Sequence, residues 1–172
     1  MYAARRFPGD AHTDLFVKPI VNGIAGKEQL YLGGPRSQQQ AQFSPDTRFV
    51  AYGDDRTGTF EIYVQPFPDA SQGKWMVSSG GGTEPRWSRN GKELFYLAGQ
   101  TLMSVPVTLT PTFSMGTPAK LFDVPVQSGY TNESDIWQAA PDGKRFLMLP
   151  PDQGQVGPPL NVIINWQALL KQ

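Results

Sequence analysis

A turn-and-strand segment that occurs three times constrains this chain more than any other feature of its sequence. The segment QFSPDTRFVAYGDD (42–55) returns as RWSRNGKELFYLAG (86–99) and, in a less similar form, as QAAPDGKRFLMLPP (138–151). Alignment of Phe43 with Trp87 gives an offset of 44 residues. Alignment of Arg89 with Pro141 gives an offset of 52. Self-similarity at such a period is typical of folds that stack one supersecondary unit repeatedly.

Each copy opens with the chemistry of a tight turn. One turn position always holds a side chain that can bond to its own backbone: Asp46, Asn90 and Asp142. Gly91 and Gly143 follow in two copies and accept a positive φ, whereas Thr47 stands there in the first copy and predicts a less relaxed turn. Short runs rich in Phe, Val, Tyr and Leu come next and suit mostly buried strands.

Each repeat predicts about four antiparallel strands. A third strand is predicted where EIYVQPF (61–67) resembles TDLFVKPI (13–20) and TLMSVPV (101–107), and a fourth at KWMVSS (74–79) and AKLFDV (119–124). Apolar spacing of 3.6 residues is not sustained anywhere except in the final WQALLKQ, which predicts one or two helical turns. We therefore predict an all-β fold: a partial β-propeller of about 3.5 blades, each of four antiparallel strands.

The composition restricts the classes of partner and cofactor. Fifteen basic residues balance fifteen acidic ones, which argues against nucleic acid or an anionic membrane surface as the main partner. Since there is no cysteine, disulfides, thiolate metal sites and a cysteine nucleophile are excluded. The start MYAARRFPGD lacks a long apolar core of a signal peptide, and no run approaches the 18 apolar residues of a membrane helix. We expect no cofactor, no metal and no membrane insertion.

The repeats resemble a known family. FSPDTRFVAY together with EIYVQPF resembles the PD40, or WD40-like, repeat of TolB-type β-propellers. GKWMVSSGGGTEPRWSRNGKELFYL and the ending PPLNVIINWQALLKQ look like the C-terminal propeller segment of large bacterial proteins, many of them serine/threonine kinases. The resemblance covers essentially the whole chain and implies a propeller, but propellers of this type serve many functions. It also implies an extracytoplasmic location, with the cytoplasm as the alternative.

The repeat register divides the chain into four units. Tyr2 aligns with Tyr52, so the first blade would lack its leading strand. The predicted units are an incomplete first blade, two full blades and a last blade with its tail: 1–35, 36–80, 81–126 and 127–172. About 3.5 blades cannot close the usual ring of 4–8. The simplest interpretation is the C-terminal portion of a longer propeller, and the other is a ring completed by two chains.

Several motifs that could carry chemistry have a simpler interpretation. VNGIAGKEQ (21–29) contains Gly26-Lys27 but lacks the remaining residues of a phosphate-binding loop, so we expect a hairpin loop. SSGGGTEP (78–85) could bind an anion through its backbone, but it also lies where one blade passes to the next. His12, the one histidine, is expected in a solvated loop without a catalytic triad.

Carboxylates and tryptophans give two further sets of candidates. The pairs Asp54 and Asp55, and Glu133 and Asp135, are expected to face solvent in hairpin loops, because neither pair matches a glycosidase or calcium-loop pattern. Trp87 and Trp166 are expected to pack between blades, whereas Trp137 is a candidate for a ligand-facing side chain.

A ligand of a propeller is expected where the innermost strands begin, because these strands line the central channel. The residues at these positions form a mixed polar rim suited to a peptide, a sugar or a protein loop: Gln40, Gln42, Glu84, Arg86, Asp135 and Gln138. The alternative is a channel lining that binds only water.

We expect a non-catalytic module that binds a protein, a peptide or a small polar ligand, with self-association through open blade edges as a further expectation. The family resemblance implies a longer TolB-like propeller or the sensor region of a receptor-type kinase, whose catalytic part would lie elsewhere because no kinase motif occurs here. The alternative is a propeller that gates a separate hydrolase domain of the prolyl-oligopeptidase type.

Overall fold

Antiparallel β-sheets account for nearly all of the described chain. The computed structural model describes residues 2–5, 12–124 and 136–149, and the helical element among them is the short 3-10 helix η1 (Ala70–Gln72). The strands form four main sheets, which we number from the N-terminus, and one separate hairpin. The prediction of an all-β fold with antiparallel sheets of about four strands is confirmed.

Consecutive strands pair in each sheet, except that the last strand of the third sheet pairs with the third strand of that sheet. The first sheet contains β1 (Tyr2–Arg5), β2 (Thr13–Val17) and β5 (Gln29–Leu32), and a hairpin of β3 (Ile20–Val21) and β4 (Ile24–Ala25) comes between the last two. The second sheet contains β6 (Gln38–Phe43), β7 (Phe49–Asp54), β8 (Glu61–Pro66) and β9 (Trp75–Met76). The third contains β10 (Thr83–Trp87), β11 (Glu93–Ala98), β12 (Thr101–Thr108), β13 (Ser114–Met115) and β14 (Ala119–Asp123). The fourth contains β15 (Trp137–Ala139) and β16 (Phe146–Met148).

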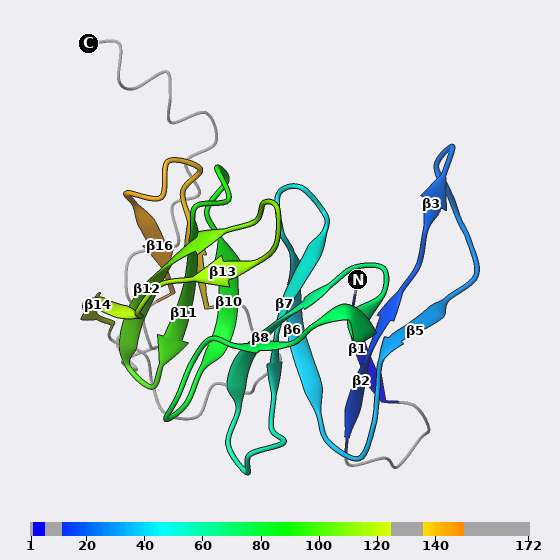
Figure 1. Ribbon diagram of the computed structural model, residues 1–172, viewed down its shortest axis with the longest axis horizontal. Helices are drawn as coiled ribbons and strands as arrows, with labels where there is room; N and C mark the ends of the chain where they lie inside the picture. The colour runs from blue at the N-terminus through cyan, green and yellow to red at the C-terminus, as the bar shows by residue number, and fades with distance from the viewer. Residues whose placement is uncertain (1, 6–11, 125–135, 150–172) are drawn as a thin grey trace, which may run out of the picture.

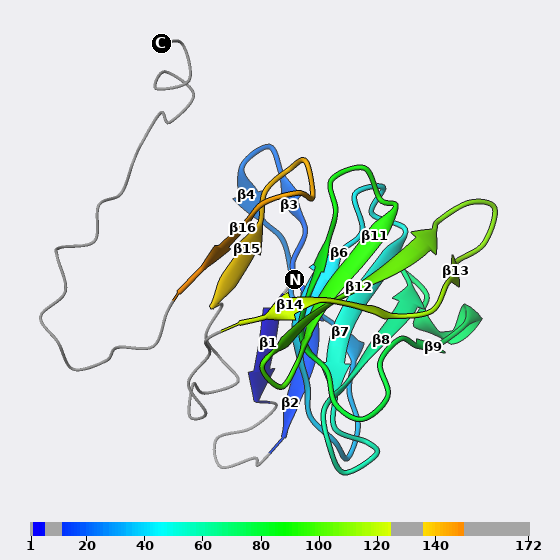
Figure 2. The same cartoon turned by 90° about the vertical axis from the view of Figure 1, so that its left-hand side faces the viewer.

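The four sheets stand side by side in chain order, from the blue strands on the right of Figure 1 to the orange strands on the left. The strands β1 and β2 contact β6, and β10 contacts β6 and β7. Figure 2 shows the same array from its left-hand side, with the third and fourth sheets toward the viewer. In the part of the chain that the structure describes, the sheets do not close into a ring, as in a partial propeller.

Apolar clusters fill the spaces between neighbouring sheets. Successive side chains of a strand point to opposite faces, so β7 gives Val50 and Tyr52 to the cluster shared with the first sheet. Its residues Phe49 and Ala51 enter the cluster shared with the third sheet. In β11, Leu94 and Tyr96 face the second sheet. Phe95 and Leu97 face the fourth sheet. We call the face toward the preceding sheet backward and the opposite face forward.

The repeated turn is held by an Asx side chain-to-backbone hydrogen bond in every copy, and also by a serine hydroxyl in the first two. Ser44 Oγ accepts a hydrogen bond from the Phe49 N–H (3.0 Å) and donates one to Asp46 Oδ1 (2.7 Å). Asp46 Oδ1 also accepts from the Arg48 N–H at 3.2 Å. The same side chain-to-backbone bond links Lys92 to Asn90 (2.9 Å) and Lys144 to Asp142 (3.0 Å). Asp46 therefore has a role in the turn.

Thr47 adopts the left-handed conformation that its counterparts adopt as glycines. Its φ is 59°, against 68° for Gly91 and 66° for Gly143. The expectation of a less relaxed first turn is thus confirmed, since a β-branched residue is strained in this region.

Some of the sequence-based predictions lie outside the described residues. They concern the helical turns in WQALLKQ, the tryptophan Trp166, and the carboxylate pair Glu133 and Asp135. Among the residues that are described, no helix has the length and apolar character needed to cross a membrane.

Candidate binding rim

The innermost strands of the second and third sheets carry matching irregularities. The pairing of β6 with β7 shifts register between Gln39 and Gln42, and that of β10 with β11 shifts between Thr83 and Arg86. Within these bulges Gln40 has a φ of 55° and Glu84 a φ of 51°. Non-glycine residues rarely adopt this conformation, and bulges serve to redirect side chains. Two predicted rim residues thus occupy equivalent positions, 44 residues apart.

These bulges direct each side chain onto the backbone of the next sheet. Gln40 Oε1 accepts a hydrogen bond from the Glu84 N–H at 2.9 Å. Glu84 Oε2 accepts one from the Ile136 N–H at 3.1 Å. The residues are separated by 44 and 52 positions, the same offsets as the sequence repeat. We call Gln40, Glu84 and Ile136 the bulge relay.

Arg86 lies next to the bulge relay in the interior. Only 4% of Arg86 and 5% of Glu84 is exposed, and Arg86 Nη2 lies 3.7 Å from Glu84 Oε2. Arg86 Nη1 donates to the Pro85 carbonyl at 2.9 Å, and its guanidinium lies 5.6 Å from the centre of the Trp137 ring. A buried cation with a carboxylate, a carbonyl and an aromatic face around it is well compensated.

The structure brings some predicted rim residues together and separates others. Gln40, Glu84 and Arg86 form one connected group. Gln42 is half-buried, and its carbonyl accepts a hydrogen bond from Trp87 Nε1 at 3.1 Å. Gln138 on β15 is exposed. Asp135 lies outside the described residues, so its place in the rim remains a prediction, as does ligand contact by all six residues.

Three buried polar atoms on the inner strands lack a hydrogen-bond partner among the described residues. They are Gln38 Oε1 and Gln39 Nε2 on β6 and Trp137 Nε1 on β15. Unpaired buried polar atoms are rare in folded proteins and require an explanation. Sequence reasoning missed Gln38 and Gln39, although the run SQQQAQF (37–43) is a detectable signal. The expectation that Trp137 faces a ligand is wrong, because only 3% of it is exposed and it packs between the third and fourth sheets.

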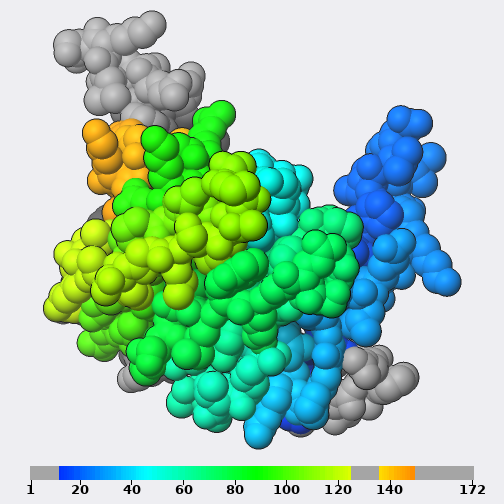
Figure 3. Space-filling view, viewed as in Figure 1, coloured from blue at the N-terminus to red at the C-terminus, as the bar shows by residue number. Residues whose placement is uncertain are grey.

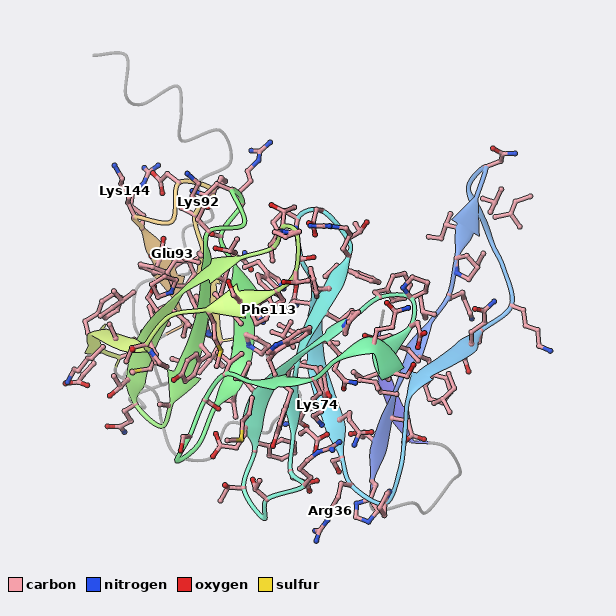
Figure 4. The ribbon with its side chains drawn as sticks, in the orientation of Figure 1. Arg36, Lys74, Lys92, Glu93, Phe113 and Lys144 are labelled. Carbon is pink, nitrogen blue, oxygen red and sulfur yellow. The ribbon has the colours of Figure 1, made fainter. Side chains whose placement is uncertain are left out.

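A second polar cluster lies in the second sheet, near the labelled Lys74 of Figure 4. The expectation that Asp54 faces solvent is wrong, since the residue is completely buried. Asp54 Oδ2 lies 2.6 Å from Arg56 Nη2 and 3.5 Å from Lys74 Nζ. The Lys74 ammonium also lies 4.0 Å from the centre of the Tyr63 ring. Two cations thus compensate one buried carboxylate, and the Tyr63 ring face stabilises the Lys74 ammonium.

Burial and charge act in opposite directions on the ionisable groups of this cluster. Burial lowers the pKa of Lys74 to about 8, against the opposing effect of the Asp54 carboxylate. Burial would raise the pKa of Asp54, but hydrogen bonds from Arg56 and the charge of Lys74 keep that pKa below its ordinary value. Burial raises the pKa of Tyr52. The cluster is a compensated ion network on one side of the second sheet.

The two glycine-rich segments have structural roles. The Gly80 and Gly81 N–H groups donate to Glu61 Oε1 at 2.8 and 2.9 Å, and the other carboxylate oxygen accepts from Ser78 Oγ. The anion that binds this loop is therefore a side chain of the protein itself. Gly26 donates its N–H to the Pro19 carbonyl at 2.7 Å and closes the β3–β4 hairpin, as expected for a hairpin loop.

Among the described residues, no three His, Cys, Asp or Glu side chains lie close enough together to hold a metal ion. No protein-family model matches the sequence, and no curated protein matches it either.

Proposed function

We propose that this chain is a non-catalytic binding module of the propeller type. In this proposal it is related to TolB-like PD40-repeat domains and to the propeller of a receptor-type kinase sensor region. Its partner is a protein, a peptide or a small polar ligand, and the binding position lies along the inner strands β6, β10 and β15.

The observation that carries the proposal is the concentration of amide groups on these strands. Four of the six residues of β6 are glutamines, and β15 presents the exposed Gln138. Each glutamine amide offers donors and an acceptor, which are the groups that a peptide bond also offers. The unpaired Gln38 Oε1 and Gln39 Nε2 belong to the same strand. An inner edge of this chemistry suits an extended peptide better than an apolar ligand.

Binding can be tested directly with the chain as it stands. Peptide and glycan arrays are probed with the labelled protein, and each positive is measured by isothermal titration calorimetry. We expect peptides to bind, and the Gln42→Ala and Gln138→Ala variants to bind about tenfold more weakly for each hydrogen bond lost. The matched control is Gln72→Ala, which removes an exposed glutamine on η1, outside the inner strands.

The arrays also define what would overturn the proposal. Absence of binding to every peptide and glycan would contradict it, as would peptide affinities that are equal for Gln138→Ala, Gln42→Ala and the unmodified chain. Glu84 and Arg86 are unsuitable for this test because both are buried and their replacement would disturb the fold.

A further inference from the structure

The fourth sheet has an apolar face that no described residue covers. In β16, Phe146 and Met148 pack backward against the third sheet. Because side chains alternate along a strand, Leu147 points forward, and 75% of it is exposed. Its counterparts in the repeat, Ala51 and Phe95, are 0% and 1% exposed because the next sheet covers them. Leu149, next on the forward side, is 46% exposed.

The first sheet also has exposed apolar side chains, on its backward side. The segment after the third strand of a sheet folds back over the preceding sheet. In the third sheet this segment brings Phe113, labelled in Figure 4, to 5.6 Å from Phe49 and 5.1 Å from Trp75, ring centre to ring centre. In the second sheet, Phe67 lies 5.4 Å from Tyr31 of the first sheet. A sheet of this protein thus covers its predecessor with an apolar extension.

The corresponding segment of the first sheet is the β3–β4 hairpin, and it covers nothing in the described chain. Ile20, Val21 and Ile24 are 72%, 65% and 73% exposed, and Leu30 on β5 is 52% exposed. The hairpin stands clear of the other sheets in the space-filling view of Figure 3. Three large apolar side chains at one hairpin tip are unusual for a solvated surface.

We propose that these two surfaces dock on each other in a second copy of this chain. The forward face of the fourth sheet in one copy accepts the backward side of the first sheet in the other, and the β3–β4 hairpin covers Leu147. The interface continues the geometry that already joins neighbouring sheets within the chain. When the same interface forms a second time, between the first sheet of the first copy and the fourth sheet of the second copy, the two chains close a two-fold ring. This ring has eight sheets, four from each copy, which is the upper limit of the 4–8 blades found in propellers.

The repeat also assigns a polar contact at this interface. Arg48, in the turn of the second sheet, donates from Nη2 to the carbonyl of Leu109 in the extension of the third sheet. The turn residue that matches Arg48 in the fourth sheet is Lys144, and alignment of Pro19 with Pro106 matches Leu109 to Asn22. Lys144 of one copy therefore lies at Asn22 of the other. The hairpin and Lys144 are at opposite sides of the array within one chain.

Disulfide cross-linking tests this contact, because the chain has no cysteine of its own. The double variant Asn22→Cys, Lys144→Cys is oxidised and run on a non-reducing gel. We expect a covalent two-chain species. The matched control is Asn22→Cys, Lys92→Cys, since Lys92 occupies the same turn position in the third sheet, where the fourth sheet already follows. Equal cross-linking of both variants, or of neither, would overturn the proposed geometry.

Sedimentation velocity tests the assembly itself. We expect a two-chain mass for the unmodified protein and monomers for Leu147→Lys and for Ile24→Lys, each checked for folding by circular dichroism. A mixture of the two variants should recover dimers, because one complementary interface remains intact. Leu121→Lys, which changes an exposed leucine on β14, should leave the dimer unaffected.

Three outcomes would overturn the proposal. They are a monomeric unmodified chain, open polymers that lengthen with concentration, and a mixture of variants that stays monomeric. None of them bears on peptide binding by the inner strands, so the proposed function and this inference fail separately.

Discussion

At the scale of single residues, Thr47 is the position where sequence and backbone are most clearly in conflict. It keeps a φ of 59° although its counterparts are glycines. We expect Thr47→Gly to raise the free energy of unfolding by about 0.5–1 kcal/mol, because strain in the folded backbone outweighs the extra entropy of the unfolded glycine. Urea denaturation at equilibrium measures the change.

The matched control for this change is Gly143→Ala in the third copy of the turn. A Cβ there would meet no atom closer than 3.6 Å, so the substitution isolates the effect of the positive φ. It should lower stability by about 1 kcal/mol. A destabilising Thr47→Gly would show that strain does not dominate at this turn.

Lys74 makes stability depend on pH in the alkaline range. Its pKa is about 8 in the folded protein, against an ordinary value of 10.5. Between these values the unfolded chain binds more protons than the folded chain, so stability rises with pH until ionisation of unfolded tyrosines such as Tyr52 opposes it near pH 10. Denaturation midpoints between about pH 7 and pH 9.5 should rise for the unmodified protein.

Two variants test whether Lys74 causes this rise of the denaturation midpoint with pH. The rise should be much smaller in Lys74→Met and unchanged in Lys92→Met, which alters an exposed lysine of a turn. A rise of the same size in Lys74→Met would place its origin in another group.

At the scale of elements, the connection between the second and third sheets depends on one carboxylate. Glu61, at the start of β8, receives hydrogen bonds from Gly80 and Gly81 and is 5% exposed. Glu61→Ala would remove the acceptor of the partly buried Gly80 and Gly81 N–H groups and of the buried Ser78 hydroxyl, and we expect a loss of about 2–3 kcal/mol. Glu61→Gln keeps an acceptor and should cost about 1 kcal/mol.

Hydrogen exchange at the Gly80 and Gly81 amides gives the local measurement. Protection should disappear in Glu61→Ala and persist in Glu61→Gln. Glu28→Ala removes a carboxylate with a 44% exposed side chain, and should change stability by less than about 0.5 kcal/mol. Full protection in Glu61→Ala would contradict the role of the carboxylate.

The elements themselves were the part of the structure that the sequence predicted well. The turns at Asp46, Asn90 and Asp142 have local signals, because an Asx side chain, followed by a glycine in two of the three copies, acts within a few residues. The bulges do not, since glutamine and glutamate have no preference for the positive φ of Gln40 and Glu84. Their conformation is fixed by acceptors and donors on the next sheet, far along the chain.

The candidate site was predictable in position and not in burial. Periodic alignment located Glu84 and Arg86 on an inner strand, but their enclosure depends on Trp137 and Ile136, which come some fifty residues later. The prediction for Asp54 failed in the same way, because Asp54 is also buried. It looked like a loop carboxylate, and the cation that helps to compensate it, Lys74, comes 20 residues later.

At the scale of the whole molecule, the described residues cover the two central sheets on both faces and the two outer sheets on one. Opening of a sheet should therefore require less energy at either end of the array. If a second copy covers these ends, amide protection in β2 and β16 should increase with protein concentration, while that in β7 and β11 should not. Exchange measured by mass spectrometry over a dilution series checks this. Outer-sheet protection that does not vary with concentration would contradict it.

The bulge relay has a consequence for how such a chain can evolve. Each junction needs only a side-chain oxygen at one position and a backbone N–H at the equivalent position of the following unit, as Gln40 and Glu84 show by using different residues for the same bond. A gene duplication that copies one unit would therefore create a working junction on both sides at once. The fourth unit has Ile136 at this position, whose side chain can accept no hydrogen bond, so its gene segment would have to change before another copy could follow it.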